Sequence, residues 1–206
     1  TNGQKFISGN KCERGAGKKL QSDLPNMVAY KNQVFNAIPL KAGGRAKIGL
    51  PRALNIYEML PFWAELFRSL DCDIVLSGIS NRKIYMKGQN TIPSDTVCYP
   101  AKLVHGHIID LLEKDIDAIF YPCMSYTFDE GISDNCYNCP VVAYYPELIQ
   151  ANITDVEKVH FLYPHLGIEN HKLFAEKMYE EFKNIIPKLT KKEMEKATEN
   201  AFTTYY

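Results

Sequence analysis

The stretch Ala46-Lys-Ile-Gly-Leu50-Pro-Arg-Ala-Leu54 decides the fold class, because a short apolar run is followed at once by a turn into a helical pattern. It predicts a buried strand over Lys47–Leu50 and a strand-to-helix turn over Pro51–Leu54. We expect Asn55 to cap the helix that follows. One face of that helix is apolar, with Tyr57, Leu60, Trp63, Leu66, Phe67 and Leu70. Short strands that are apolar throughout are typical of parallel sheets covered on both faces.

The same strand-then-helix pattern recurs along the chain. Further strands are predicted over residues 73–76, 117–121, 140–144 and 159–162, and helices over 81–87, 100–114, 146–151, 169–186 and from 190 onward. This alternation predicts an α/β fold: a Rossmann-like three-layer domain with a mostly parallel sheet, an N-terminal lead-in and C-terminal helices.

We divide the chain into three parts. Residues 1–45 form a lead-in or linker with one helix that starts near Asp23, residues 46–165 form the cysteine-bearing α/β domain, and residues 166–206 form C-terminal helices. The chain starts without Met and stops inside a helical pattern, so we interpret it as a piece of a longer polypeptide that holds some of its partners.

Composition excludes several classes of protein. With 46% apolar and 12% aromatic residues the chain is not of the disordered type, and no apolar run approaches the ~20 residues of a membrane span. We find no signal peptide and expect a cytoplasmic location. Net charge is zero, yet residues 1–45 hold eight basic and two acidic groups. This basic lead-in is typical either of a segment that binds an anionic partner or of a solvated linker. We expect neither nucleic acid nor a membrane as a partner.

The six cysteines are the main chemical signal: Cys12, Cys72, Cys98, Cys123, Cys136 and Cys139. In a chain without a secretion signal, metal or redox chemistry is favoured over disulfides. Cys72 lies between a helix and a strand and is interpreted as a packed apolar side chain. Cys98 precedes a helix, whose free N–H groups favour a thiolate. Cys123 follows the strand that ends near Tyr121, at the edge where open α/β sheets bind ligands.

Cys136-Tyr-Asn-Cys139 lies in a seventeen-residue connection over residues 124–140, and so long an irregular loop is usually functional. A CxxC pair serves zinc sites, redox pairs and iron–sulfur centres alike. We predict that Cys98, Cys123, Cys136 and Cys139 meet at one edge of the sheet. The alternative is that Cys98 and Cys123 are apolar fillers, while the CxxC forms a local disulfide or binds nothing.

Other polar residues give weaker signals. Arg52 and Asn55 occupy the first strand-to-helix turn, where backbone N–H groups attract anions, so we assign them to cofactor binding. His105 and His107 are two apart on a helix and point to different faces, which indicates core or capping roles. Glu147 near a helix start stabilises the helix dipole. We recognise no Ser-His-Asp or paired-carboxylate arrangement and therefore name no catalytic residue.

Several motifs together carry a family resemblance: Ile48-Gly-Leu-Pro-Arg-Ala-Leu-Asn-Ile-Tyr-Glu58, Val97-Cys-Tyr-Pro-Ala-Lys102, His105-Gly-His107, Phe120-Tyr-Pro-Cys123 and Asn138-Cys-Pro-Val-Val142. Over residues 5 to 152 the chain resembles the central domain of 2-hydroxyacyl-CoA dehydratase activator-related proteins (CoA-substrate-specific enzyme activase-related). In that family the domain follows ATPase modules of the actin/Hsp70 type and precedes a part similar to a dehydratase subunit.

The resemblance implies an iron–sulfur site. Dehydratase subunits hold a [4Fe–4S] cluster on cysteines placed much as Cys98 and Cys123 are, with Cys139 or Cys136 completing the set here. In the dehydratases the third ligand lies in another subdomain, whereas a nearby CxxC here offers a closed set suited to electron transfer. Cys12 echoes a cysteine-containing, glycine-rich segment of the activase and is a further candidate ligand.

These observations predict an accessory domain of anaerobic metabolism that relays electrons between an ATP-dependent activase and a 2-hydroxyacyl-CoA dehydratase-like partner. Two alternatives stay open. One is a structural zinc or thiol-only interaction module, and the other is an acyl-CoA-binding dehydratase-type domain. We do not expect the isolated piece to be catalytic.

Overall fold

The computed structural model describes residues 24–40, 44–131 and 134–205, and it divides the chain into two compact units, Thr1–Ala37 and Ile38–Tyr206. The described part of the first unit contains α1 (Met27–Asn36), none of whose residues is buried. This helix begins at Asn26, whose side-chain oxygen accepts a 3.0 Å hydrogen bond from the Ala29 N–H. A helix in the lead-in is thus confirmed, while Asp23, its predicted start, lies outside the described residues.

The second unit alternates strands and helices as predicted. Its elements are β1 (Lys47–Leu50), α2 (Leu54–Glu58), α3 (Leu60–Ser69), β2 (Asp73–Leu76), α4 (Arg82–Gly88), α5 (Tyr99–Leu112), β3 (Ala118–Phe120), β4 (Cys123–Met124), α6 (Pro140–Asn152), β5 (His160–Leu162), β6 (His165–Leu166), α7 (His171–Phe182) and α8 (Lys191–Tyr205). Short 3₁₀ turns cover Gln89–Thr91 and Thr154–Lys158. The strand predictions for residues 73–76, 117–121 and 159–162 are therefore confirmed.

One sheet forms the middle layer of this unit. Its strand order is β2-β1-β3-β5, every neighbouring pair is parallel, and Ile48 of β1 lies opposite Ile74 on one side and Ala118 on the other. Strands β4 and β6 form a second, two-stranded parallel pair. Since β1 and β3 are buried along almost their whole length, they carry the continuous apolar runs expected of a sheet covered on both faces.

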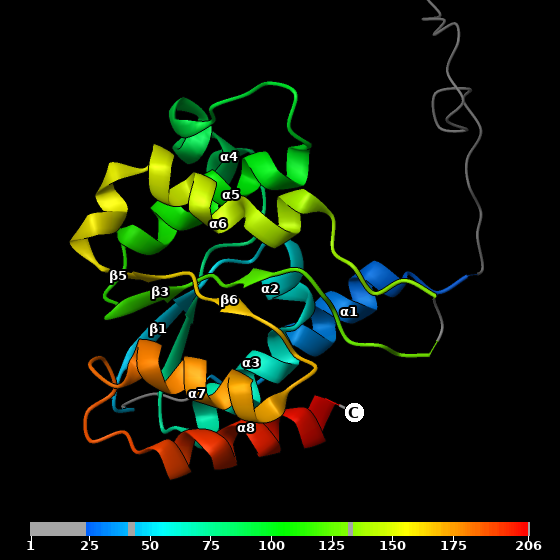
Figure 1. Ribbon diagram of the computed structural model, residues 1–206. Coiled ribbons are helices and arrows are strands. Elements are labelled where there is room, and N and C mark those ends of the chain that lie inside the picture. Colours follow the sequence, from blue (N-terminus) through cyan, green and yellow to red (C-terminus); the bar gives the residue numbers. More distant parts are fainter. Residues whose placement is uncertain (1–23, 41–43, 132–133, 206) are drawn as a thin grey trace, which may run out of the picture. The chain divides into compact units, whose positions relative to one another are not determined.

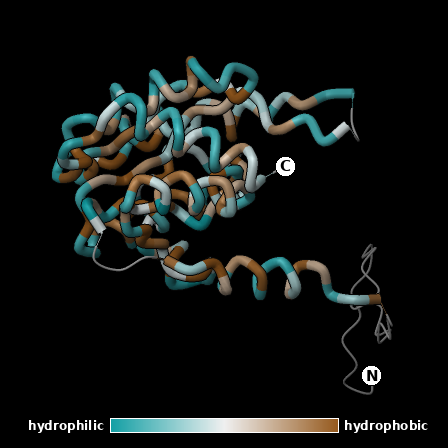
Figure 2. Tube along the Cα trace, turned by 90° about the horizontal axis from the view of Figure 1, so that it is seen from below, coloured by the Kyte–Doolittle hydropathy of each residue, from teal (hydrophilic) through white to brown (hydrophobic). Residues whose placement is uncertain are grey.

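Helices cover the two faces of the sheet, with α4, α5 and α6 on one side and α3, α7 and α8 on the other (Figure 1). This is the Rossmann-like three-layer α/β fold that the sequence predicted. Hydrophobic residues gather in the interior of the unit and hydrophilic residues along its outline (Figure 2). In the described part of the chain no helix combines the length and the apolar character needed to cross a bilayer.

Glycines bring α4 and α5 into direct backbone contact. A Cβ atom on Gly106 would lie 1.8 Å from the Ile84 carbonyl oxygen, and one on Gly88 would lie 2.2 Å from the Gly106 nitrogen. Neither position has room for a larger residue, because the opposing atoms are backbone. This close approach fixes α5, and with it the helix start that carries Cys98.

Two sequence predictions about local structure are wrong. Asn55 does not cap a helix: Ala53 is the N-cap residue of α2, Asn55 is the second residue inside it, and a break at Met59 separates α2 from α3. Residues 140–144 are not a strand but the start of α6. Pro140 occupies the first helical position, where its fixed φ suits a helix and its missing N–H costs nothing, and this outweighs the strand preference of the two valines that follow.

Candidate metal centre

Two cysteines occupy equivalent positions at helix starts. Cys98 is the N-cap residue of α5 and Cys139 is that of α6, with backbone angles of φ −62°, ψ 152° and φ −64°, ψ 153°. Both side chains are exposed, and a proline follows within two residues in each case. The first N–H groups of a helix lack partners inside it and favour an anionic ligand. Both cysteines therefore lie at helix starts, although neither side chain caps the helix by a hydrogen bond.

Cys123 lies just beyond β3, at the carboxyl edge of the sheet. Its backbone N–H donates to the Pro164 carbonyl over 2.9 Å, and strand pairing places it opposite His165. Its side chain is only 2% exposed. Burial, then the Glu147 carboxylate, raise the pKa of the Cys123 thiol to about 11, although the Glu147 backbone N–H donates to this sulfur and acts in the opposite direction. Near neutral pH this sulfur is therefore protonated until a metal displaces its proton.

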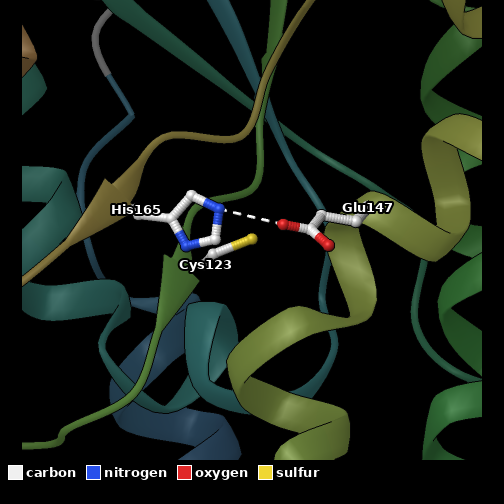
Figure 3. A group of neighbouring side chains, drawn as sticks. All are labelled: Cys123, Glu147 and His165. Carbon is white, nitrogen blue, oxygen red and sulfur yellow. Dashed lines mark hydrogen bonds and ion pairs between the residues drawn. The ribbon is translucent and has the colours of Figure 1, made fainter.

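Cys123, Glu147 and His165 form a compact group of potential metal ligands. The Cys123 sulfur, a Glu147 oxygen and a His165 ring nitrogen all lie within 4.8 Å of one another. Figure 3 shows the imidazole and the carboxylate meeting above the thiol, and a 2.9 Å hydrogen bond joins His165 Nε2 to Glu147 Oε1. The side chains of His165 and Glu147 are 55% and 52% exposed. The group is thus open to solvent on one side and buried at its sulfur.

The loop that carries the CxxC motif folds back along the chain that leaves β4. The Thr127 N–H donates to the Cys136 carbonyl over 2.9 Å and the Asn138 N–H to the Ser125 carbonyl over 2.8 Å, while Tyr126 and Tyr137 form an antiparallel bridge. Continuing this pairing brings Cys139 back to the level of β4.

The same pairing sets Cys136 beside Thr127, three residues farther from β4 than the position of Cys139. Three residues of extended chain span about 10 Å, so Cys136 and Cys139 occupy different levels of the loop. Burial, followed by the Asp129 carboxylate, raises the pKa of the Cys136 thiol. Of the two cysteines in the CxxC motif, Cys139 is therefore the one directed toward β4.

Two buried tyrosines connect the three remaining cysteines. The Tyr121 hydroxyl is fully buried and has no hydrogen-bond partner among the described residues. Burial raises its pKa well above the usual value, with further contributions from Tyr145, Cys123 and Cys139, which therefore all lie near it. The Tyr145 hydroxyl lies 3.0 Å from His105 Nε2, and burial followed by nearby Cys98 raises its pKa to about 12. Cys123 and Cys139 thus lie near Tyr121, and Cys98 lies near Tyr145.

The remaining cysteines lie elsewhere. Cys72 is buried, with its sulfur 3.6 Å from the Leu70 carbonyl oxygen, which confirms its interpretation as a packed side chain. Cys12 lies outside the described residues. All five cysteines that the structure describes are free thiols.

The polar residues of the first strand-to-helix turn and of α5 are buried or held in place. Arg52 donates from Nε to the Ser77 carbonyl over 2.8 Å, and Asn55 is buried against a pocket. Both histidines of α5 are buried, which confirms their core role: His105 bonds Thr91 and Tyr145, and His107 lies 2.9 Å from the hydroxyls of both Ser77 and Ser80. Burial lowers the pKa of each imidazole to about 4, so both are neutral near pH 7.

Sequence reasoning missed His165 altogether and placed Glu147 near a helix start, which is wrong, because Glu147 lies in the middle of α6. The one available signal was the Pro164-His165 pair soon after β5, which ends a strand as Pro122-Cys123 ends β3. The two-residue strands that then place Cys123 beside His165 are too short for any periodic pattern to reveal them.

The geometry defines an α/β domain with free thiols at the carboxyl edge of its sheet. Residues 47–206 match the family model described as CoA enzyme activase uncharacterised domain (DUF2229), and the chain belongs to this family. The resemblance of its motifs to activase-related proteins is therefore confirmed. Comparisons with curated proteins and with solved structures gave no match.

Proposed function

We propose that this domain is a cytoplasmic, non-catalytic iron–sulfur module that relays electrons between an ATP-dependent activase and a 2-hydroxyacyl-CoA dehydratase-like partner. The observation that carries the proposal is the placement of Cys123 on β4, of Cys139 on the segment that pairs back toward β4, and of Cys98 and Cys139 at the starts of α5 and α6. Membership of the CoA enzyme activase family supports the activase as one of the two partners.

The donor set suits a [4Fe–4S] cluster. Cysteine thiolates are the usual ligands of such clusters, and ligands that bind different irons lie farther apart than those of a single ion. Cys98, Cys123 and Cys139 would hold the cluster, and Cys136, the fourth cysteine predicted from the sequence, would have to move in from its position beside Thr127 to join them. The unpaired, buried Tyr121 hydroxyl fits the same conclusion, since it offers a hydrogen bond to sulfur where the described residues supply no other acceptor. When bound, such a cluster supplies a one-electron redox centre.

The protein's own groups would set the properties of that centre. The positive ends of the α5 and α6 dipoles would favour an anionic cluster bound next to Cys98 and Cys139. His105 holds the Tyr145 hydroxyl near Cys98 through a 3.0 Å hydrogen bond. Hydrogen bonds to sulfur and burial tune the potential of iron–sulfur centres. Because Cys98 and Cys139 are exposed while Cys123 is buried, the site has one side open to a partner protein.

Anaerobic reconstitution of the full chain with iron and sulfide, followed by visible and EPR spectroscopy, tests the proposal. We expect a cluster signal that is lost in Cys98→Ala, Cys123→Ala and Cys139→Ala. Cys72→Ala is the matched control, because its sulfur is buried elsewhere, and this variant should keep the signal. The proposal fails if the wild-type chain gives no cluster, or if Cys98→Ala and Cys123→Ala retain it.

The group of Cys123, Glu147 and His165 favours a second candidate function, a structural zinc module. Thiolate, imidazole and carboxylate are all zinc ligands, and these three lie close enough to bind one ion. The iron–sulfur cluster and the zinc ion both require Cys123, so only one of them can bind to that sulfur. His165→Ala separates them, with His160→Ala as a control at another exposed histidine. If zinc is the resident metal, elemental analysis finds one ion per chain and only His165→Ala loses it. If the cluster is resident, both variants retain the iron.

A further inference from the structure

A chain of hydrogen bonds runs through the buried imidazole of His105. At one end, Thr91 Oγ1 lies 2.8 Å from the Gly88 carbonyl oxygen and 2.8 Å from His105 Nδ1. At the other end, the Tyr145 hydroxyl of α6 lies 3.0 Å from His105 Nε2. His105 is fully buried and Tyr145 is 3% exposed. The chain therefore joins the end of α4 to the tyrosine that lies near Cys98.

The partners of this chain determine where each proton lies. The Gly88 carbonyl can only accept, so the Thr91 hydroxyl donates its single proton there. Thr91 Oγ1 must therefore accept a hydrogen bond from the Nδ1–H of His105. A neutral imidazole carries one proton, so His105 Nε2 has a lone pair and accepts a hydrogen bond from the Tyr145 hydroxyl. With its proton on His105, the Tyr145 oxygen has only lone pairs to present toward Cys98.

His105 is a neutral base placed close to the candidate site. It follows Cys98 by seven residues, close to two helical turns, so both lie on the same face of α5. The backbone around Gly88 on α4, Thr91 of the 3₁₀ turn and Tyr145 of α6 pack against it. Burial alone lowers the pKa of this imidazole, and among the described residues no charged group faces it. A negative charge added nearby would therefore act on His105 without competition from another ion.

We propose that His105 takes up one proton when a cluster held at Cys98 gains an electron, and that Tyr145 transmits this proton. The Tyr145 O–H bond breaks as its proton moves to His105 Nε2, and a proton from solvent forms a new O–H bond directed at the Cys98 sulfur. The partner that reduces the domain supplies the electron, so one electron and one proton are added and Tyr145 keeps its composition. The inference rests on the proposed iron–sulfur function and deepens it, because it makes electron transfer through the domain dependent on pH.

Redox titration of the reconstituted full chain, followed by EPR between pH 5 and pH 8, tests the inference. We expect the midpoint potential to fall as pH rises, by up to about 59 mV per pH unit, the value for one proton per electron. His105→Gln cannot take up the proton and should make the potential independent of pH. His107→Gln is the matched control on the same helix, because His107 bonds Ser77 and Ser80 instead of a tyrosine, and it should keep the slope. A flat potential in the wild type, or an unchanged slope in His105→Gln, would overturn the inference.

A second readout needs no metal. Nitrogen-15 NMR of the metal-free chain near neutral pH reports which ring nitrogen of His105 carries the proton, and we expect Nδ1. Thr91→Ser keeps the hydroxyl and should keep this tautomer, whereas Thr91→Val removes the acceptor for Nδ1–H and should lose the preference. A proton on Nε2 in the wild type, or an unchanged tautomer in Thr91→Val, would contradict the arrangement from which the inference is drawn.

Tyr145→Phe tests the path between the sulfur and the imidazole. It removes the hydroxyl that transmits the proton but keeps the ring, so the cluster signal should persist while the slope of potential against pH is lost. An unchanged slope in this variant would overturn the role of Tyr145. The EPR signal separates the two proposals: a cluster with a flat potential leaves the proposed function standing and ends this inference, whereas the absence of a cluster ends both.

Discussion

The two helical layers that cover the sheet differ in what they bury. The layer of α3, α7 and α8 packs aromatic rings edge to face, among them Phe62, Trp63, Phe67, Phe174, Phe182 and Phe202. The layer of α4, α5 and α6 buries His105, His107 and Asp110 instead, together with the hydroxyl of Ser77. One layer gains stability from close apolar packing, while the other holds polar groups in fixed positions, among them His105, which bonds the Tyr145 hydroxyl near Cys98. The sheet thus lies between a layer that mainly stabilises the fold and a layer that holds buried polar groups.

Asp110 shows how a carboxylate of the polar layer stays ionised although it is mostly buried. Burial acts to raise the pKa of this carboxyl group, but hydrogen bonds from Lys87, from the Gly78 N–H and from Lys114 outweigh it and lower the pKa to about 2. The Lys87 and Gly78 bonds are 2.7 Å and 2.8 Å long. Because Lys87 lies on α4 and Gly78 follows β2, this one carboxylate ties α5 to two other elements.

The largest effect is expected in the aromatic layer. Phe62→Ala should lower the free energy of unfolding by about 3–5 kcal/mol, because the ring is fully buried and meets the rings of Trp63, Phe174 and Phe202. Urea unfolding near neutral pH measures the change. Leu173→Ala on α7 is the control, since its side chain is exposed, and it should cost well under 1 kcal/mol. Similar losses in the two variants would mean that the aromatic cluster does not dominate this layer.

Acid should destabilise the protein through the polar layer. The folded pKa of His107, about 4, lies below its ordinary value of 6.5, so the unfolded chain takes up the proton first as pH falls. Stability is therefore lost from about pH 6.5 down to about pH 4, by roughly 3 kcal/mol for this imidazole.

His107→Gln removes that titration and should reduce the acid loss by the same amount. The measurement is the unfolding free energy in urea at several pH values across this window. His160→Gln, which removes an exposed imidazole on β5, is the control and should leave most of the acid loss in place. A pH dependence that is unchanged in His107→Gln would show that the buried imidazole is not responsible.

The cysteines should react with alkylating agents at different rates. A rise in the pKa of Cys123 from 9.0 to about 11 lowers its thiolate fraction about 100-fold, and its sulfur is also buried. Exposed Cys98 and Cys139 should therefore react much faster with iodoacetamide in the metal-free chain. Peptide mapping by mass spectrometry over time gives the separate rates. Labelling of Cys123 as fast as Cys98 would contradict the buried position of its sulfur.

The sequence predicted the central sheet well, because its strands are short apolar runs between turn residues. Lys47–Leu50 and Asp73–Leu76 have the predicted bounds, since β-branched and aliphatic side chains buried on both faces leave little alternative. The start of α6 was predicted wrongly for a similar reason. Pro140-Val-Val-Ala-Tyr144 is also a short apolar run, and only the conformation of Cys139 and Pro140 makes it a helix.

The candidate site was predictable only in part. The positions of Cys98 before a helix and Cys123 after a strand follow from local pattern, and the structure has Cys98 at the start of α5 and Cys123 just beyond β3. The pairing of Cys123 with His165 depends instead on two strands of two residues each, joined through a contact between distant segments. The different levels of Cys136 and Cys139 depend on backbone pairing inside a long loop. Neither feature has a periodic signal in the sequence.

The smallest expected effect tests whether the two layers unfold together. Asn81 caps α4 in the polar layer, accepting hydrogen bonds from the Lys83 and Ile84 N–H groups, and Asn170 caps α7 in the aromatic layer by accepting one from Leu173. Asn81→Ala and Asn170→Ala should each lower the unfolding free energy by about 1 kcal/mol. Urea unfolding and amide hydrogen exchange measure the global and local effects. Because both layers are anchored on one sheet, we expect both variants to lower the global value. If Asn81→Ala instead speeds exchange only in α4 and α5, the polar layer opens separately, and the candidate site can be exposed without unfolding the aromatic layer.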